Sequence, residues 1–271
     1  MPHKVRDKTR MFPHYCKMKE YGLIGHPLGH SFSKKFFTDK FCREGIDASY
    51  ANFDIPDASM LMDIIQEHPN LVGVNCTIPH KESVMQILDS ITPEAQEIGA
   101  VNVIKILRSR EHSTGTSERN FKLIGYNSDI IGFKQSIAPL LNAYHRNALI
   151  LGTGGAAKAV AVGLRQLGLT HTYVSRSPKE GRLTYEDITT ETMGKFQVIV
   201  NCTPVGMFPH TDEAPQLPYE ALTPQHILFD LIYNPEETLF LRKGREKGAT
   251  TKNGMDMLRL QALAAWDIWT K

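Results

Sequence analysis

A glycine-rich turn near the middle of the chain has the residue types and the spacing that bind a dinucleotide. The run ALILGTGGAAKAV over residues 148–160 places an apolar strand pattern directly before Gly152 and a helical pattern directly after the turn. Gly152 would allow the tight turn, Gly154 the close approach of a pyrophosphate, and Ala157 close packing of helix on strand. The G-x-G-x-x-A spacing alone is a weak signal, but its position between a strand and a helix predicts phosphate binding at the helix N-terminus.

The next predicted strand ends in residues that favour NADP over NAD. An enzyme that uses NAD usually carries an acidic residue about 20 positions after the first glycine, where it binds the ribose 2′-hydroxyl. In that region this chain has Ser175, Arg176 and Ser177. A guanidinium flanked by hydroxyls suits the negative charge of a 2′-phosphate, so the sequence predicts NADP as the cofactor. The alternative is a solvated arginine at a strand end.

Polar side chains also follow the predicted strands in the first half of the chain, at the sheet edge where ligands of open α/β sheets bind. The segment GHPLGHSFS ends a strand and begins a helix, which puts Ser31 and Ser33 at the helix N-terminus. Hydroxyls together with free N–H groups form a carboxylate site. Either serine could instead do no more than cap the helix.

Two more strand ends supply amides, a hydroxyl and charged groups. The segment VNCTIPHKES ends a strand with Asn75 and Thr77 and puts Lys81 in the first turn of a predicted helix, where the helix dipole disfavours a cation. Asn102 follows in GAVN, and Asp129 begins a predicted helix in GYNSDIIGF. For Asp129, plain capping of that helix is the alternative.

The segments that must position these groups alternate between strand and helix patterns. In the first half we predict strands at 21–24, 50–55, 72–78, 101–106 and 123–126. We predict helices there at 34–43, 58–66 and 82–88. In the second half we predict strands at 148–151, 172–174, 198–201 and 227–232. We predict helices there at 129–142, 156–167, 237–246 and 255–269. The alternation predicts an α/β protein of two domains, a substrate domain with a mostly parallel sheet and a Rossmann-like domain that binds NADP.

The last predicted helix is expected to return to the first domain, because only from that side can Gln261 reach a substrate held by Ser31 and Asn102. Gln261 lies near an apolar stripe, where a polar amide needs a partner, either the ligand or a structural hydrogen bond. We therefore expect a discontinuous substrate domain over residues 18–128 plus 254–271 and a dinucleotide domain over residues 129–253. Residues 1–17 are expected to form a loose extension. The polar stretch 108–120 is expected to form a long hairpin loop.

Composition excludes several classes of protein. The formal net charge is +2, from 31 basic and 29 acidic side chains, so no global field favours nucleic acid or a membrane surface. No apolar run approaches the ~20 residues needed to span a bilayer. The four cysteines are widely spaced, without a C-x-x-C pair or a signal peptide, which predicts reduced thiols, a cytoplasmic location and no metal site. Both a monomer and a homodimer remain open.

Six motifs, in order from residue 18 to residue 271, resemble the shikimate dehydrogenase family. These motifs are GHPLGHSFS, GVNCTIPHKE, GAVN, GYNSDIIGF, GTGGAA and NGMDMLRLQA. The resemblance implies reversible reduction of 3-dehydroshikimate to shikimate with NADPH. It also implies a small-molecule substrate and a role in the biosynthesis of chorismate and the aromatic amino acids.

The resemblance further implies a role for each matching residue. The catalytic pair would be Lys81 and Asp129. Ser31 and Ser33 would hold the substrate carboxylate. The ring hydroxyls would be held by Asn75, Thr77, Asn102 and Gln261, and Tyr233 would line the cleft. The cofactor would contact the glycine-rich turn, the arginine region and the residues after two later strands, namely Gly152, Gly154, Gly155, Ala156, Ser175, Arg176, Ser177, Thr203, Val205 and Gly254.

The chain departs from the family pattern around the cofactor. The usual Asn-Arg-Thr after the second Rossmann strand is Ser-Arg-Ser here, and Glu180 with Lys179 beside it stands where a further arginine is often found, which softens the expected preference for NADP. The usual Thr before the catalytic Asp is Ser128. The usual Asn-Ala-Thr is Asn-Cys-Thr followed by Pro204, which changes the nicotinamide pocket.

Two other functions share part of this pattern. A quinate or quinate/shikimate dehydrogenase would carry the same motifs and differ in its tolerance of a C1 hydroxyl and in its cofactor, and Ser31 together with Arg176 favours shikimate and NADP. A non-catalytic NADP-binding sensor would keep the fold without needing both Lys81 and Asp129.

Overall fold

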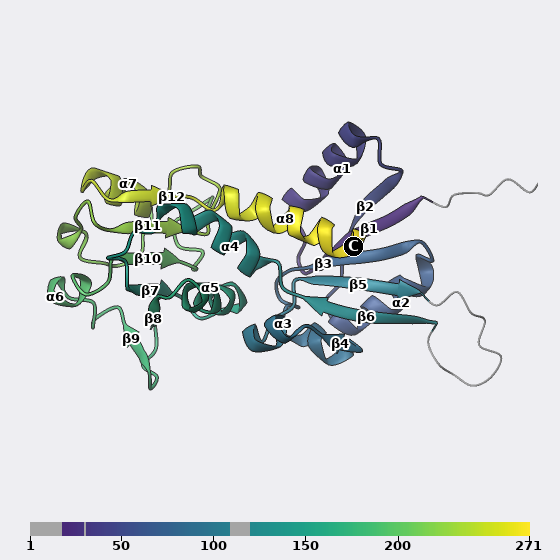
Figure 1. The fold of residues 1–271 in the computed structure, drawn as a ribbon, viewed down its shortest axis with the longest axis horizontal. Helices are drawn as coiled ribbons and strands as arrows, with labels where there is room; N and C mark the ends of the chain where they lie inside the picture. Colours follow the sequence, from purple (N-terminus) through teal and green to yellow (C-terminus); the bar gives the residue numbers. More distant parts are fainter. Residues whose placement is uncertain (1–17, 30, 109–119) are drawn as a thin grey trace, which may run out of the picture.

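The structure is a computed structural model that describes residues 18–29, 31–108 and 120–271. The predicted extension 1–17 and residues 109–119 of the predicted loop lie outside the described residues. The described chain forms two lobes, each built on one six-stranded sheet (Figure 1). The predicted α/β class, with one substrate lobe and one Rossmann-like lobe, is confirmed.

The first lobe contains a mixed, mostly parallel sheet. Its strands are β1 (Lys19–Gly25), β2 (Ala48–Asp54), β3 (Leu71–Cys76), β4 (Ser90–Ile91), β5 (Val103–Arg108) and β6 (Phe121–Tyr126). The order across the sheet is β2-β1-β3-β5-β6-β4. Strand β1 runs parallel to β2 and β3, whereas β5 runs antiparallel to β3 and β6. The pairing of β5 with β6 agrees with the predicted hairpin.

The helices of the first lobe follow the predicted order, with one correction. They are α1 (Phe32–Glu44), α2 (Leu61–Glu67) after a short 3-10 turn at Ala58–Met60, and α3 (Pro93–Ile98). The predicted helix 82–88 is instead a 3-10 helix over Ser83–Ile87, and Lys81 lies in the turn before it. The chain must leave this helix at once to pair β4 with β6, and the Asp89 carboxylate accepts the Leu123 N–H at 2.7 Å. The helix dipole therefore gives no argument about Lys81.

The second lobe contains an all-parallel sheet. Its strands are β7 (Asn147–Leu151), β8 (Thr170–Ser175), β9 (Arg182–Thr184), β10 (Val198–Asn201), β11 (Ile227–Asp230) and β12 (Thr250–Lys252). The order is β12-β11-β10-β7-β8-β9, and α5 (Gly155–Gln166), α6 (Thr190–Met193) and α7 (Leu239–Glu246) accompany the strands. Strands β10 and β11 are buried along their whole length, as expected for a parallel sheet covered on both faces. The short elements β4, β9, β12, α3 and α6 were not predicted.

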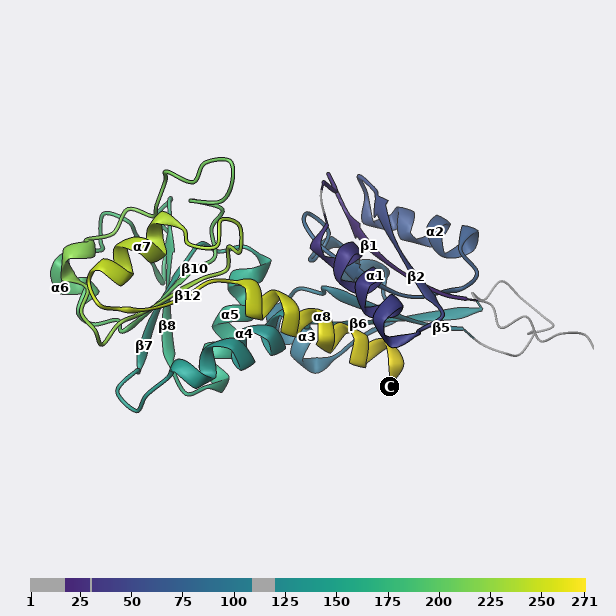
Figure 2. The ribbon, with the colours of Figure 1, turned by 90° about the horizontal axis from the view of Figure 1, so that it is seen from above.

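Two helices connect the lobes and lie side by side in both views (Figures 1 and 2), namely α4 (Asp129–Ile137) and α8 (Met255–Thr270). Helix α8 begins against the core of the second lobe with Met257 and ends in the core of the first lobe. There Trp269 packs with Tyr21 and Phe37, and its Nε1 donates to the Ile104 carbonyl oxygen at 3.1 Å. The last helix therefore contacts the cores of both lobes, and its C-terminal half packs on the first.

The two connecting helices touch at Gly132. A Cβ at this position would lie 2.5 Å from the Met257 carbonyl oxygen and 3.0 Å from the Gln261 Cβ. We expect Gly132→Ala to lower the free energy of unfolding by about 1–3 kcal/mol, the cost of overpacking against backbone that cannot move. Thermal unfolding measures the change. Gly194→Ala is the control, because Gly194 is exposed with a φ of −62°, and a loss there of the same size would contradict the explanation.

Helix α5 is tied to the first lobe by side chains of complementary charge. Lys158 Nζ donates to Glu82 Oε1 at 2.8 Å, and Arg165 bonds to Glu97 further along the helix. Glu82 directly follows Lys81 in the sequence. Because α5 begins at the glycine-rich turn, the Lys158–Glu82 contact joins the first half of that helix to the turn that carries Lys81.

Candidate active site

The predicted catalytic and substrate residues meet in one cavity of about 440 Å³ between the lobes. Its lining includes every residue assigned to those two roles, Ser31, Ser33, Asn75, Thr77, Lys81, Asn102, Asp129, Tyr233 and Gln261. The predicted cofactor residues Ala156 and Gly254 line it as well. Strands β1 and β3 are parallel neighbours, so the segments that follow them emerge at the same edge of the sheet.

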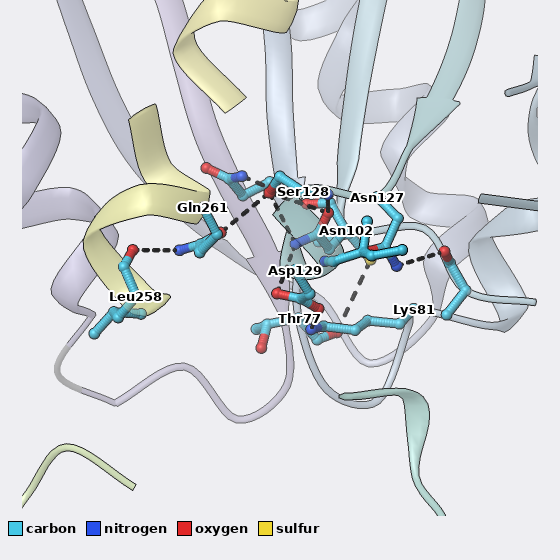
Figure 3. Close-up of polar contacts among 12 residues, drawn as sticks. Thr77, Lys81, Asn102, Asn127, Ser128, Asp129, Leu258 and Gln261 are labelled. Atoms are coloured by element: carbon cyan, nitrogen blue, oxygen red, sulfur yellow. Dashed lines mark hydrogen bonds and ion pairs between the residues drawn. The ribbon is translucent and has the colours of Figure 1, made fainter. Parts of the chain in front are cut away.

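Lys81 and Asp129 form an ion pair in this cavity (Figure 3). Lys81 Nζ donates to Asp129 Oδ2 at 2.5 Å, and the side chains keep only 18% and 10% of their surface exposed. Asn102 Nδ2 donates to the other carboxylate oxygen, Asp129 Oδ1, at 2.8 Å. Asp129 is therefore held at both oxygens. It is not the cap of α4, because the Asn127 side chain accepts the Ile130 N–H in that role at 3.3 Å.

The turn that carries Lys81 is fixed by two hydrogen bonds that the sequence did not reveal. The Lys81 carbonyl oxygen accepts from the Val101 N–H at 2.8 Å. A ring nitrogen of the buried His80 lies 2.6 Å from the Ile55 carbonyl oxygen, at the end of β2. Both partners come from distant segments, so no local pattern could have indicated them.

A chain of hydrogen bonds runs from this pair to α8 (Figure 3). Asn102 Oδ1 accepts from the Ser128 N–H at 2.6 Å, and Ser128 Oγ donates to Gln261 Oε1 at 3.3 Å. Gln261 Nε2 donates to the Leu258 carbonyl oxygen at 3.0 Å. Gln261 thus has the structural partners that the sequence left open, and it also lines the cavity, where its second N–H could meet a ligand.

The predicted carboxylate end of the cavity combines a helix cap with a buried tyrosine. Ser31 Oγ caps α1 by accepting the Lys34 N–H at 3.3 Å, which is the alternative considered for this residue. Tyr50 was not predicted to have a role, because it lies inside a strand pattern. It is buried, its hydroxyl donates to Asn75 Oδ1 at 2.7 Å and contacts Ser33, and burial raises its pKa well above the ordinary value. Tyr50 thus contacts the side chains of Asn75 and Ser33, two residues that are predicted to bind the substrate.

The hydrogen bond from Tyr50 leads to a prediction for substrate binding. We expect Tyr50→Phe to raise the KM for the expected substrate, shikimate, about three- to tenfold, because the Asn75 amide then keeps only the longer hydrogen bond from its Nδ2 to the Asn102 carbonyl oxygen, at 3.4 Å. Steady-state kinetics at saturating NADP⁺ measure this. The KM for NADP⁺ is the internal control, and an unchanged KM for shikimate would show that Asn75 keeps its orientation without the hydroxyl.

A second cavity, of about 790 Å³, lies beside the glycine-rich turn in the second lobe. Its lining contains most of the residues assigned to the cofactor, namely Gly152, Gly154, Ser175, Arg176, Thr203 and Val205. Gly155 and Ser177 line neither cavity. A Cβ at Gly155 would nevertheless lie only 3.7 Å from Lys81 Cδ, so the start of α5 adjoins the Lys81–Asp129 pair.

The glycine-rich turn requires glycine at its first position and is open at its second. Gly152 adopts a φ of +101°, and a Cβ there would lie 3.1 Å from Thr203 Cγ2, so the turn needs glycine. A Cβ at Gly154 would meet nothing within 4 Å, which leaves the N-terminus of α5 open to a close-fitting ligand. The exposed Arg176 lines the far part of the same cavity with Tyr185, which the sequence did not single out. These residues fit a phosphorylated dinucleotide.

Three further findings concern a thiol in the first cavity, candidate metal ligands and membrane-spanning helices. Burial raises the pKa of Cys76, which lines the first cavity, to about 12, so its thiol stays protonated at neutral pH. Within the described ranges, no group of three or more His, Cys, Asp or Glu side chains could hold a metal ion. Among the helices of the described chain, none has both the length and the apolar character needed to cross a membrane.

The parallel nucleotide-binding lobe, the polar cavity with its lysine–aspartate pair and the joining of the two at α5 define a two-domain α/β oxidoreductase. Residues 23–104 match the family model described as the shikimate dehydrogenase substrate binding domain. The chain is 36% identical to the shikimate dehydrogenase (NADP(+)) of Desulforamulus reducens, over 94% of this chain and 90% of that protein. It is 35% identical to the enzyme of the same name from Methanococcus maripaludis, over 94% and 92% of the two chains.

Solved structures give the same result. A shikimate 5-dehydrogenase from Thermus thermophilus in complex with NADP(H) and shikimate is 30% identical, with a TM-score of 0.78 over 93% of this chain and 94% of that chain. A shikimate dehydrogenase in complex with NADP⁺ is 34% identical, with a TM-score of 0.77 over 94% and 90%. This chain belongs to the shikimate dehydrogenase family. The family and the enzyme class predicted from the motifs are confirmed.

Proposed function

We propose that this protein reversibly reduces 3-dehydroshikimate to shikimate with NADPH; its relatives are named shikimate dehydrogenase (NADP(+)). The observation that carries the proposal is the Lys81–Asp129 pair, which lies in a cavity of hydroxyl and amide groups and adjoins the start of α5 at Gly155. The cavity thus offers a proton donor and ring-hydroxyl partners beside a dinucleotide site.

The second cavity is proposed to hold the cofactor. The turn at Gly152 and Gly154 would receive the pyrophosphate at the N-terminus of α5, and Arg176 with Ser175 would face the 2′-phosphate. When it is bound, NADPH supplies the hydride. Thr203 and Val205 line the same cavity, and Gly254 and Ala156, which line the first cavity, would meet the part of the cofactor that lies beside the substrate.

Lys81 and Asp129 are proposed to handle the proton. Reduction of a ketone leaves an alkoxide oxygen, which needs a proton as its charge develops, and Lys81 Nζ carries one that it shares with Asp129 Oδ2. Asn102 holds the other oxygen of that carboxylate, so the lysine and the carboxylate keep one relative orientation. In the direction of shikimate oxidation, the same two groups would accept the hydroxyl proton.

The remaining lining residues are proposed to hold the substrate. Ser31 and Ser33 would bind the carboxylate near the N-terminus of α1, which favours an anion. The ring hydroxyls would be held by the amides and hydroxyls on the other walls, Asn75, Thr77, Asn102 and Gln261, with Tyr233 at the rim. Tyr233 is 38% exposed, which suits a residue at the mouth of the cavity.

The division of the chain is also a proposal. Residues 18–128 with 254–271 would form the substrate domain and residues 129–253 the dinucleotide domain, which the return of α8 to the first sheet supports. The described cysteines are free, which supports the proposed cytoplasmic location. A monomer or homodimer without nucleic acid partners fits the near-neutral net charge.

Shikimate oxidation with NADP⁺, followed at the absorbance of NADPH, tests the proposed function. We expect turnover with shikimate to exceed turnover with quinate, and NADP⁺ to be preferred over NAD⁺. Equal or faster turnover of quinate would assign the chain to the quinate enzymes instead. Binding of NADPH without turnover of either acid would support a non-catalytic sensor.

Cofactor preference leads to a further prediction. We expect Arg176→Asp to weaken NADPH binding by about tenfold or more, because the 2′-phosphate loses a charge-assisted hydrogen bond worth ~1.5–3 kcal/mol and meets a repelling carboxylate. NADH lacks that phosphate and is the matched control ligand, so its affinity should change little. Fluorescence titration measures both dissociation constants. Equal losses for the two cofactors would remove Arg176 from the phosphate site.

A further inference from the structure

The ends of β10 and β11 hold a buried carboxylate that the proposed reaction does not use. Asp230, Asn201 and Thr238 each have 0% of their surface exposed. Asp230 Oδ1 accepts from Asn201 Nδ2 at 3.1 Å and from the Ile232 N–H at 3.0 Å. Asp230 Oδ2 accepts from Thr238 Oγ1 at 2.6 Å. The carboxylate thus connects three segments of the second lobe.

Asn201 extends this network into the cofactor cavity. Its Oδ1 accepts from the N–H and the hydroxyl of Thr203, at 3.0 and 2.6 Å. Its Nδ2, besides bonding to Asp230, donates to the Val205 carbonyl oxygen at 3.4 Å. Thr203 and Val205 both line the second cavity, and Thr203 adjoins Gly152. One amide side chain therefore sets the path of the loop over residues 203–205.

On its other side, Asp230 holds a wall of the substrate cavity. The Ile232 N–H that bonds to Asp230 lies between Leu231 and Tyr233, and both of these line the first cavity. The Ile232 carbonyl oxygen accepts from the Gly254 N–H at 3.0 Å, and Gly254 lines the same cavity. The network consequently links a loop of the cofactor cavity to a wall of the substrate cavity.

A carboxylate at this position is costly. Burial raises the pKa of Asp230 to about 6, although three hydrogen bonds favour its charged form. An asparagine has the same shape without the cost of desolvating a charge. A buried charge is weak evidence for stability, whereas a geometric role accounts for a group that accepts from three separate donors.

We propose that Asp230 and Asn201 are positioning residues, which hold the cofactor loop 203–205 in register with the substrate wall 231–233. The inference rests on the proposed function. Neither side chain lines either cavity, so each is proposed to act through the backbone and side chains that it holds.

The test measures NADPH binding by fluorescence titration without substrate, on Asp230→Ala, Asn201→Ala and the double variant. We expect each single variant to weaken binding about tenfold, and the double variant to be no weaker than the worse single, because the two residues act through one network. Ile227→Ala is the matched control. Ile227 is a buried core residue at the opposite end of β11 from Asp230, and its side chain takes no part in the hydrogen-bond network, so this variant should be less stable yet bind NADPH within about twofold of wild type.

Asp230→Asn tests whether the hydrogen-bond acceptor at position 230, rather than its charge, is what NADPH binding requires. It keeps an oxygen for Asn201 and for the Ile232 N–H, and we expect it to bind NADPH within about threefold of wild type. If Asp230→Ala does not fold, Asn201→Ala decides, because it cuts the same link and leaves the carboxylate bonded to Thr238 and Ile232.

Three outcomes would overturn the proposal. Single variants whose affinity matches the Ile227→Ala control would do so, as would an unchanged affinity in Asn201→Ala, or losses that simply multiply in the double variant. A wild-type protein that binds NADPH but does not oxidise shikimate would refute the proposed function alone, since the binding test needs no turnover.

Discussion

Lys81→Ala is expected to lower kcat for shikimate oxidation by about 10² to 10⁴, with a modest change in KM, as for the loss of a general acid–base group. Lys81 Nζ is placed in the first cavity to deliver a proton to a developing alkoxide, and Asp129, whose other oxygen accepts from Asn102, orients it. Alanine leaves the carboxylate bonded to Asn102 but removes the proton. Steady-state kinetics with NADP⁺ and shikimate measure the effect.

Lys195→Ala is a suitable control for this experiment. Lys195 is also paired with a carboxylate, that of Glu191, but it is 65% exposed and lies in the second lobe outside both cavities. Its removal should leave kcat unchanged. A Lys81→Ala protein with near-normal kcat and a raised KM would make the lysine a binding residue, and Asp129 or an ordered water would then be the next candidate for the proton donor.

Asp129→Asn is expected to lower kcat by about 10² or more and to raise the KM for shikimate as well. The carboxylate accepts from two donors, Lys81 Nζ and Asn102 Nδ2, one at each oxygen. An amide offers only one acceptor, so one of these donors would face an NH₂ group and the pair would lose its orientation. The kinetics of both directions of the reaction measure the change.

The fold of this variant should be intact, because the Asn127 side chain caps α4 independently of Asp129. Circular dichroism and thermal unfolding check this. Asp39→Asn serves as the control, since Asp39 pairs with Lys35 on the exposed face of α1. A kcat that survives in Asp129→Asn would show that the lysine needs no charged partner.

The parts of the site that depend on local patterns could be predicted from the sequence. The turn at Gly152 and Gly154 needs a strand before it and a helix after it, and both are visible as apolar runs of the correct length. Ser31, Asn75 and Asn102 could be placed together because each lies in a segment at or near one end of a predicted strand. The roles themselves came from the family resemblance, since a serine at a helix start is equally well explained as a cap.

The interactions that tune the site could not be predicted, because their partners are distant in the sequence. Tyr50 lies 25 residues from Asn75, and Ser128 lies 133 residues from Gln261. The turn at Lys81 resembled a helix because apolar residues follow it at helical spacing, but the pairing of β4 with β6 leaves room only for a short 3-10 helix. Tertiary structure decided these points against the local preference.

The return of α8 has a consequence for how the protein is made. Trp269 fills the space over Gly73, where a Cβ would lie 2.3 Å from its ring, and packs on Tyr21 and Phe37 of the lobe that leaves the ribosome first. That lobe cannot complete its core until residues 255–270 have been synthesised, so an aromatic surface stays uncovered throughout translation. The first lobe is therefore synthesised first but completes its folding last. A chain that ends before α8 lacks both Gln261 and the aromatic packing of Trp269 on the core of the first lobe.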